Sequence, residues 1–159
     1  MGTLGHIELS IPVIWHYTSE VRQAVDTVMQ GHAGPLRQAT QMVASELVEN
    51  ALKYGQATPE IQQIRFSLWL NEQEIVIEVT NGVCDRAALA EFEARIATIK
   101  QSDDKEELLL SRMQEIFARP TFESQLGLYR IASEGGFQLE YNYNVSALTV
   151  RATRKIHGQ

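Results

Sequence analysis

Apolar and polar residues alternate along three stretches of the chain, and this predicts strands with one buried face. The first stretch, residues 6–15 (HIELSIPVIW), contains Pro12, which has no amide donor, so we place this strand near a sheet edge. The other two, residues 64–70 and 74–80, are separated by the polar residues NEQ, as in a β-hairpin.

Apolar residues spaced three or four positions apart predict two helices after the first strand. The first covers residues 18–34, with Thr18 or Ser19 as its cap and glycines at its end. Pro35 then opens a helix that Gly55 ends. The inner face of this second helix is predicted to carry Leu36, Ala39, Val43, Leu47 and Ala51.

Three more helices are predicted in the second half of the chain. Residues 85–101 form one, and residues 103–119 form another, with Asp103 and Glu106 at the spacing of a capping box. Residues 124–136 form a short helix that a pair of glycines closes.

Residues 137–154 complete the pattern with a hairpin that is predicted to turn near residues 142–144. The strands occur mostly as hairpin pairs, which favours an antiparallel or mixed sheet over a doubly wound parallel sheet. We therefore expect an α/β (α+β) fold, a two-layer sandwich with helices covering one face of a mostly antiparallel sheet. At 159 residues the chain is predicted to form one domain, residues 1–159.

Composition narrows the possible functions. The net charge is −6 and no basic cluster is longer than residues 151–155 (RATRK), which argues against nucleic-acid binding. No apolar run is long enough for a signal peptide or a membrane span, and the single Cys84 cannot form an internal disulfide, so we expect a cytoplasmic protein. The histidines show no zinc-ligand spacing with this cysteine.

One polar residue interrupts the apolar stripe of the helix that begins at Pro35. Asn50 follows Leu47 by three residues, where another apolar side chain is expected, and a buried amide is costly unless it is paired. Glu46 and Lys53 lie on nearly the same side, so a carboxylate, an amide and an ammonium converge there. A purely structural interpretation, in which Asn50 bonds nearby backbone, stays open on this helix alone.

The segment ELVENALKYG, residues 46–55, resembles the N-box of the GHKL superfamily of ATPases and kinases. This resemblance implies the GHKL, or Bergerat, ATP-binding fold, with ATP and Mg²⁺ as ligands. It also implies that Asn50 is the magnesium ligand and that Glu46 is the general base of a serine/threonine kinase. The metal would then be the partner of the buried amide, held also by phosphate oxygens.

Two later segments resemble the superfamily in the same order along the chain. IVIEVTNG, residues 75–82, stands where the superfamily has a strand and a D-x-G-x-G turn, and residues 126–141 stand where it has a glycine turn, a helix and a strand. The usual Asp is replaced by Thr80 or Asn81, and two glycines are replaced by Cys84 and Gln125. The resemblance implies that nucleotide is bound by Asn50, Lys53, Thr80, Asn81, Gly82, Gly127 and Leu128.

Within the superfamily the chain resembles the SiaB-type family, which is related to anti-sigma-factor kinases. This implies phosphorylation of Ser or Thr on a small STAS-like or anti-sigma-antagonist-like partner in bacterial partner switching. The segment 85–123 would take the place of the ATP lid, either as packed helices or as a surface for a partner. A homodimer through the first strand is also possible.

Three interpretations remain open from the sequence. The chain is either an active kinase or a degenerate module that regulates its partner by binding alone, which the missing glycines favour and the retained Glu46 opposes. The third interpretation is an unrelated sandwich in which the N-box match is a coincidence.

Overall fold

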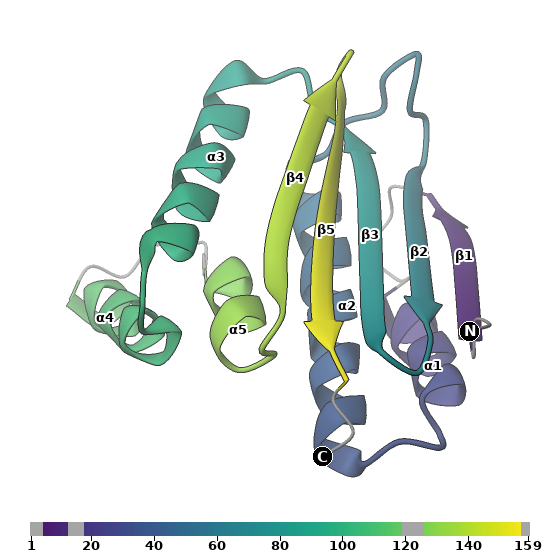
Figure 1. Ribbon diagram of the computed structural model, residues 1–159. Coiled ribbons are helices and arrows are strands. Elements are labelled where there is room, and N and C mark those ends of the chain that lie inside the picture. Colours follow the sequence, from purple (N-terminus) through teal and green to yellow (C-terminus); the bar gives the residue numbers. More distant parts are fainter. Residues whose placement is uncertain (1–4, 13–17, 119–125, 157–159) are drawn as a thin grey trace.

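The computed structural model describes residues 5–12, 18–118 and 126–156 (Figure 1). Within them, one five-stranded sheet is antiparallel throughout and has the strand order β1-β2-β3-β5-β4. The strands are β1 (Gly5–Ile11), β2 (Ile64–Leu70), β3 (Glu74–Gly82), β4 (Gln138–Asn144) and β5 (Ala147–Lys155). The predicted two-layer sandwich with an antiparallel sheet is confirmed.

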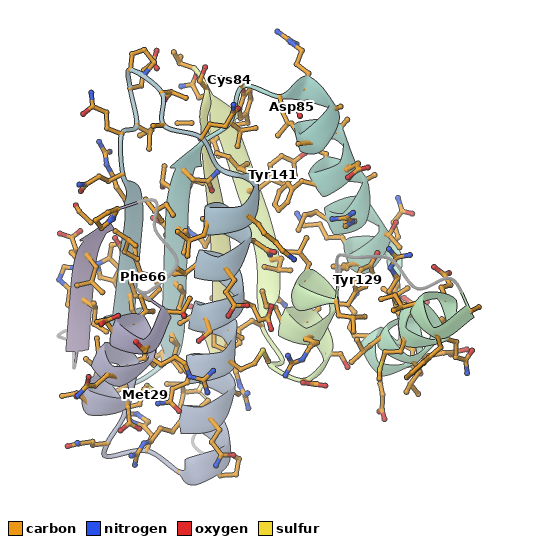
Figure 2. All side chains as sticks on the ribbon, turned by 180° about the vertical axis from the view of Figure 1, so that it is seen from behind. Met29, Phe66, Cys84, Asp85, Tyr129 and Tyr141 are labelled. Carbon is orange, nitrogen blue, oxygen red and sulfur yellow. The ribbon has the colours of Figure 1, made fainter. Side chains whose placement is uncertain are left out.

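The sheet has one face covered by helices, and the alternation of each strand decides which side chains lie there. In β3, Ile75, Ile77, Val79 and Asn81 are buried, whereas the residues between them are partly exposed. The covered face of β2 carries Ile64, Phe66, Leu68 and Leu70, which are all buried. Figure 2 shows Phe66 between the sheet and the helices that cover it.

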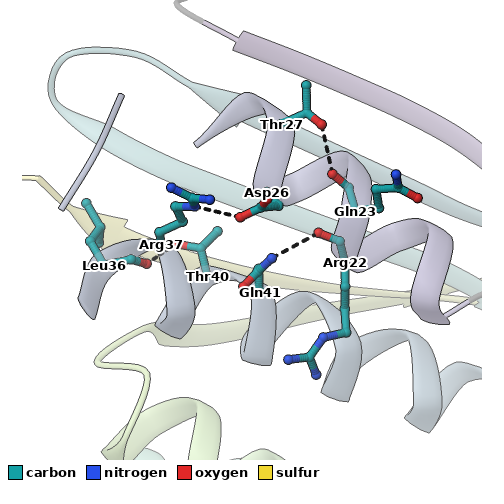
Figure 3. Close-up of polar contacts among 8 residues, drawn as sticks. All are labelled: Arg22, Gln23, Asp26, Thr27, Leu36, Arg37, Thr40 and Gln41. Carbon is teal, nitrogen blue, oxygen red and sulfur yellow. Dashed lines mark hydrogen bonds and ion pairs between the residues drawn. The ribbon is translucent and has the colours of Figure 1, made fainter. Parts of the chain in front are cut away.

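Helices α1 (Thr18–Val28) and α2 (Gly34–Tyr54) pack on this covered face. Their apolar residues join one core with the sheet, and polar contacts fix the two helices against each other (Figure 3). Arg37 Nε donates to Asp26 Oδ1 at 2.6 Å, and Gln41 Nε2 donates to the backbone oxygen of Arg22 at 3.2 Å. The position of α2 across the sheet centre is therefore fixed by core packing and by α1.

The remaining helices are α3 (Arg86–Gln101), α4 (Lys105–Ala118) and α5 (Gly127–Ser133). Helix α3 stands beside the sheet edge formed by β4 (Figure 1). The rings of Phe92 and Tyr141 meet edge to face at 5.4 Å between centroids, and the Tyr141 hydroxyl donates to Glu93 Oε2 at 2.8 Å. Helix α4 packs on α5, so the three helices extend the covered layer past β4.

The first strand is an edge strand as predicted, although its expected continuation over residues 13–15 lies outside the described residues. Its free edge leaves the homodimer a prediction. None of the helices in the described part of the chain is long and apolar enough to cross a membrane.

Two local predictions are wrong in detail. The cap of α4 is Asp104, whose Oδ1 accepts from the amide of Glu107 at 3.0 Å, one position after the predicted pair. The last hairpin turns at Val145 and Ser146, where both residues have positive φ (47° and 64°). Gly55 ends α2 as predicted. Its backbone is extended (φ −76°), and a Cβ there would lie 2.3 Å from the Ala51 oxygen.

Val145 is an unfavourable residue at its position. Positive φ crowds a β-branched side chain, and turns of this kind favour Asn. The exposed Val145 side chain offers little packing in compensation, since 65% of it faces solvent. We therefore expect Val145→Asn to raise the free energy of unfolding by about 1 kcal/mol, measured by urea denaturation. Val145→Thr keeps the β-branch and serves as the control, so an equal gain for both would contradict this explanation.

Candidate functional site

A cavity of about 330 Å³ lies between α2, α3, α5 and the covered face of the sheet. Its lining is largely apolar, with polar side chains from α2, β3 and the segment around α3. Main contributions come from Leu47, Asn50 and Ala51 of α2, Val79 and Asn81 of β3, Leu148 and Val150 of β5, Asp85, Leu89, Glu91, Phe92 and Arg95 around α3, and Gly127 and Leu128 of α5. Pockets of about 300–1,000 Å³ with this mixed lining are typical of sites for small molecules.

Asn50 lines this cavity from the inner side of α2. Its side chain is partly buried, and no hydrogen bond joins its amide to another of the described residues. The amide therefore keeps a donor and an acceptor for a ligand in the cavity. This placement differs from the structural interpretation, in which nearby backbone would satisfy Asn50.

Glu46 lies one turn before Asn50, at the place where α5 begins against α2. A Cβ added at Gly127 would lie 2.6 Å from Glu46 Oε2 and 3.7 Å from Asn50 Nδ2. Only glycine permits this approach without displacing the carboxylate, because any other residue carries that Cβ. Glu46 and Asn50, which the N-box places one turn apart, are thus brought together with Gly127. Asn50 and Gly127 line the cavity, and Glu46 lies beside them, outside its lining.

Arg130 binds the carboxylate of Glu46 from the first turns of α5. Its Nη1 donates to Glu46 Oε1 at 3.0 Å, and its Nε donates to Glu134 Oε2 at 3.0 Å. The Glu46 side chain is 19% exposed and that of Arg130 is 39% exposed, so this ion pair is partly screened by water. Arg130 therefore orients the candidate base and leaves it partly exposed.

Burial raises the pKa of Glu46 above its ordinary value, because desolvation disfavours the charged form. The charges of Glu49 and Glu134 raise this pKa further, while Arg130 and Lys53 lower it. A carboxyl group with a raised pKa accepts a proton more readily, which suits a general base.

Asn81 faces the cavity at the end of β3, and only 5% of it is exposed. Its Nδ2 donates to the Gly82 oxygen at 3.2 Å, which leaves the Oδ1 acceptor for a ligand. Thr80 lies on the opposite face of the sheet, where its hydroxyl is 2.8 Å from that of Thr149. Of the two register alternatives, Asn81 is the one on the side of the cavity.

Three other predicted site residues lie at different distances from the cavity. Leu128 lines it and is buried. Gly82 lies outside the lining of the cavity and pairs with Gln56, whose backbone N–H donates to the Gly82 backbone oxygen at 2.8 Å. Lys53 is exposed outside the lining, and its charge reaches the site only through the pKa of Glu46.

Sequence reasoning missed the residues that α3 contributes to the cavity, and it also missed Arg130 of α5, which binds Glu46. Asp85 caps α3, since its Oδ1 accepts from the amide of Ala87 at 2.9 Å, and it also lines the cavity (Figure 2). Arg95 lines the cavity with a side chain that is 17% exposed and lies 3.5 Å from Glu91. The helix was predictable, but the face turned toward the cavity depends on contacts with β4, and no local pattern encodes them.

No family model matches the chain, and no curated protein sequence matches it significantly. The fold is similar to that of a chain in the crystal structure of the SiaB–SiaC complex from Pseudomonas aeruginosa. The TM-score is 0.73 with 19% sequence identity, over 93% of this chain and 88% of that chain. At this identity the likeness shows a shared fold.

The ion pair with Arg130 makes a testable prediction about Glu46. Removing the positive charge with Arg130→Met should raise the pKa of Glu46 further, whereas Glu134→Gln should lower it. Carbon NMR titration of the Glu46 carboxyl would measure both shifts. A shift of the same sign in the two variants would contradict the assigned charge environment.

The raised pKa of Glu46 also makes the free energy of unfolding depend on pH. A carboxyl whose pKa is higher in the folded state stabilises the fold fully below its unfolded pKa, and this contribution is lost as the pH rises through the folded pKa. We therefore expect the instability of Arg130→Met relative to the parent to grow with pH across this window, as measured by urea denaturation at several pH values.

Proposed function

We propose that this protein binds Mg-ATP in the cavity and acts as a serine/threonine protein kinase-like regulator of a small partner protein in the cytoplasm. The observation that carries this proposal is the convergence of Glu46, Asn50 and Gly127, of which Asn50 and Gly127 line the cavity. These residues supply a carboxylate, an unpaired amide and a backbone without a side chain at the same place. By the family resemblance, Glu46 would be the base, Asn50 would be the magnesium ligand, and the backbone of Gly127 would lie close to phosphate.

The residues of the cavity fit a nucleotide with its metal. The amide of Asn50 makes no hydrogen bond within the described chain, so its carbonyl oxygen is available as a ligand of Mg²⁺. Gly127 leaves room for phosphate beside Asn50, and Arg95 supplies a cation in the cavity wall. Magnesium, when bound, would neutralise negative charge on the transferred phosphoryl group.

Asn81 lines the cavity from β3, and Leu47, Leu128 and Val150 give it apolar lining. The base, Glu46, would act from beside the cavity next to Gly127. The Asn81 Oδ1 would accept a hydrogen bond from the adenine amino group, the pairing used wherever Asn reads adenine. Thr80, on the other face of the sheet, takes no part in this arrangement.

Glu46 would take the proton from a Ser or Thr hydroxyl of the partner. The hydroxyl oxygen then bonds to the terminal phosphorus while the bond to the bridging oxygen of ADP breaks. Arg130 donates to one oxygen of Glu46, Oε1, so part of the negative charge of the carboxylate is already neutralised before the partner binds. Arg130 is thereby a positioning residue, because it acts on the reaction through Glu46.

A binding module without phosphoryl transfer is the second candidate function. It is favoured by the same ion pair, since Arg130 occupies the carboxylate that a kinase needs as a base. In both cases the partner is a protein. The similar fold comes from a complex of two proteins, SiaB and SiaC, and this supports a partner here. We propose a small STAS-like protein, as the family resemblance implies.

Asn50→Ala should weaken magnesium-dependent ATP binding by about tenfold or more while leaving the fold stable. A lost hydrogen bond to a charged ligand costs on the order of 1.5–3 kcal/mol, and the described residues give the amide no structural bond to lose. Calorimetry with ATP and Mg²⁺ would measure the affinity, with Asn142→Ala, an exposed residue of β4, as the control. Unchanged binding with a loss of about 2 kcal/mol in stability would favour the structural interpretation.

Glu46→Gln keeps the size of the side chain and removes the base. The variant should still bind Mg-ATP but transfer phosphate to a candidate STAS-like protein about 10²–10⁴-fold more slowly, measured with radiolabelled ATP. Glu72→Gln, which alters an exposed acid in the turn between β2 and β3, is the matched control and should keep its rate. If the parent transfers no phosphate while Glu46→Gln binds the partner equally well, the protein is the binding module instead.

A further inference from the structure

Helix α4 carries a row of exposed apolar side chains that the nucleotide site does not use. Leu110, Met113 and Phe117 are 52%, 36% and 81% exposed. Their spacing of three and four residues places them on one side of the helix. We call these three residues the α4 stripe. Grouped apolar exposure of this kind marks an interaction surface more often than isolated apolar residues do.

The other side of α4 is already occupied by the protein itself. Leu109 is buried, and the guanidinium of Arg112 lies 6.0 Å from the ring centroid of Tyr129 in α5. Helix α4 therefore presents apolar side chains both to α5 and to solvent. A helix that only covered the sheet would need the first side alone.

Several acidic residues surround the α4 stripe, and two basic residues of α4, Lys105 and Arg112, already make contacts within the protein. Lys105 Nζ bonds the backbone oxygens of Ile99 and Ser102, and Arg112 Nη1 lies 2.7 Å from Glu115 Oε2. Glu106 and Glu107 are exposed, and neither side chain forms an ion pair with another described residue. The surface beside the stripe therefore keeps negative charge that a partner can neutralise.

A hollow of about 360 Å³ lies at the start of α4. Asp103, Asp104 and Glu107 line it together with Ser102, Leu108 and Ser111. Asp104 is held by its capping bond to the amide of Glu107, whereas Asp103 is exposed. Glu107 lies one turn before Leu110, so the hollow meets the stripe at this carboxylate, and its other acids continue around the start of the helix.

We propose that the α4 stripe and this hollow form the docking surface for a basic amphipathic segment of a protein partner. The apolar side chains of the segment lie on Leu110, Met113 and Phe117, and its Lys or Arg side chains reach the carboxylates of the hollow. Charge complementarity selects this occupant. Anionic membranes and nucleic acids carry the wrong sign, and a second copy of a chain with net charge −6 would place acid against acid.

The docking surface is also continuous with the candidate site. Helix α4 packs on α5, and Tyr129, which contacts Arg112, precedes the Arg130 that binds Glu46. A partner held on α4 therefore lies beside the helix that carries the base's ion pair. The surface deepens the proposed function by naming how its partner is held, but it requires neither ATP nor phosphoryl transfer.

The test uses the full chain and a synthetic helix of leucine and lysine with one apolar side. Fluorescence anisotropy measures its affinity without nucleotide, and amide NMR shifts locate it. A peptide of the same composition in scrambled order and a leucine–glutamate helix are the probe controls. We expect tight binding of the first probe alone, with shifts concentrated in residues 102–118.

Replacing the stripe by Leu110→Ser, Met113→Ser and Phe117→Ser together should weaken binding by at least about tenfold, since central apolar anchors carry most of an interface's free energy. Asp103→Asn with Glu107→Gln should weaken it too and reduce its salt dependence. Val145→Ser and Glu72→Gln, which alter an exposed apolar residue and an exposed acid elsewhere, are the matched controls. Circular dichroism and urea denaturation verify that each variant is folded.

Several outcomes overturn the proposal. They are equal binding by the stripe variant and the parent, shifts outside residues 102–118, or a weakening by the two controls that matches the weakening by the stripe variant. A dimer in analytical ultracentrifugation that the stripe variant dissolves would show that a second copy covers α4. ATP calorimetry on the parent protein keeps the two questions apart. Absence of nucleotide binding there would refute the proposed function and leave the docking result standing.

Discussion

The contact between α2 and α5 at Gly127 is the constraint on which the candidate site depends. A Cβ at this position would lie 2.6 Å from Glu46 Oε2, so the carboxylate keeps its present place beside α5 only because the residue is glycine. The approach places Asn50 and Glu46 beside the backbone of α5. It also closes one end of the cavity, which the sheet and α3 complete.

Electrostatics at this contact has two opposing parts. Burial makes the charged form of Glu46 less favourable, while Arg130 stabilises it through a hydrogen-bonded ion pair. The same arginine also binds Glu134, so its charge is divided between two carboxylates. Because one arginine binds both carboxylates, a change of charge at either of them alters how firmly Glu46 is held.

The three helices of the second half give the fold two surfaces of different character. Helix α3 turns Phe92 and Arg95 toward the cavity and is held to β4 through Tyr141. Helix α4 turns its apolar stripe outward and lies against α5. Because α5 contacts both α2 and α4, a single short helix connects the cavity with the outer surface. Neither α3 nor α4 is a mere cover for the sheet.

The sequence by itself determined the order and type of the elements, because alternation and helical spacing are local properties of the chain. It also marked Asn50 as out of place, since an amide within an apolar stripe needs a partner. It could not choose between Thr80 and Asn81, because that choice depends on which face of the sheet the helices cover. Arg130 stayed unnoticed for the same reason. It lies 84 positions from Glu46, and only the packing of α5 on α2 brings the two charges together.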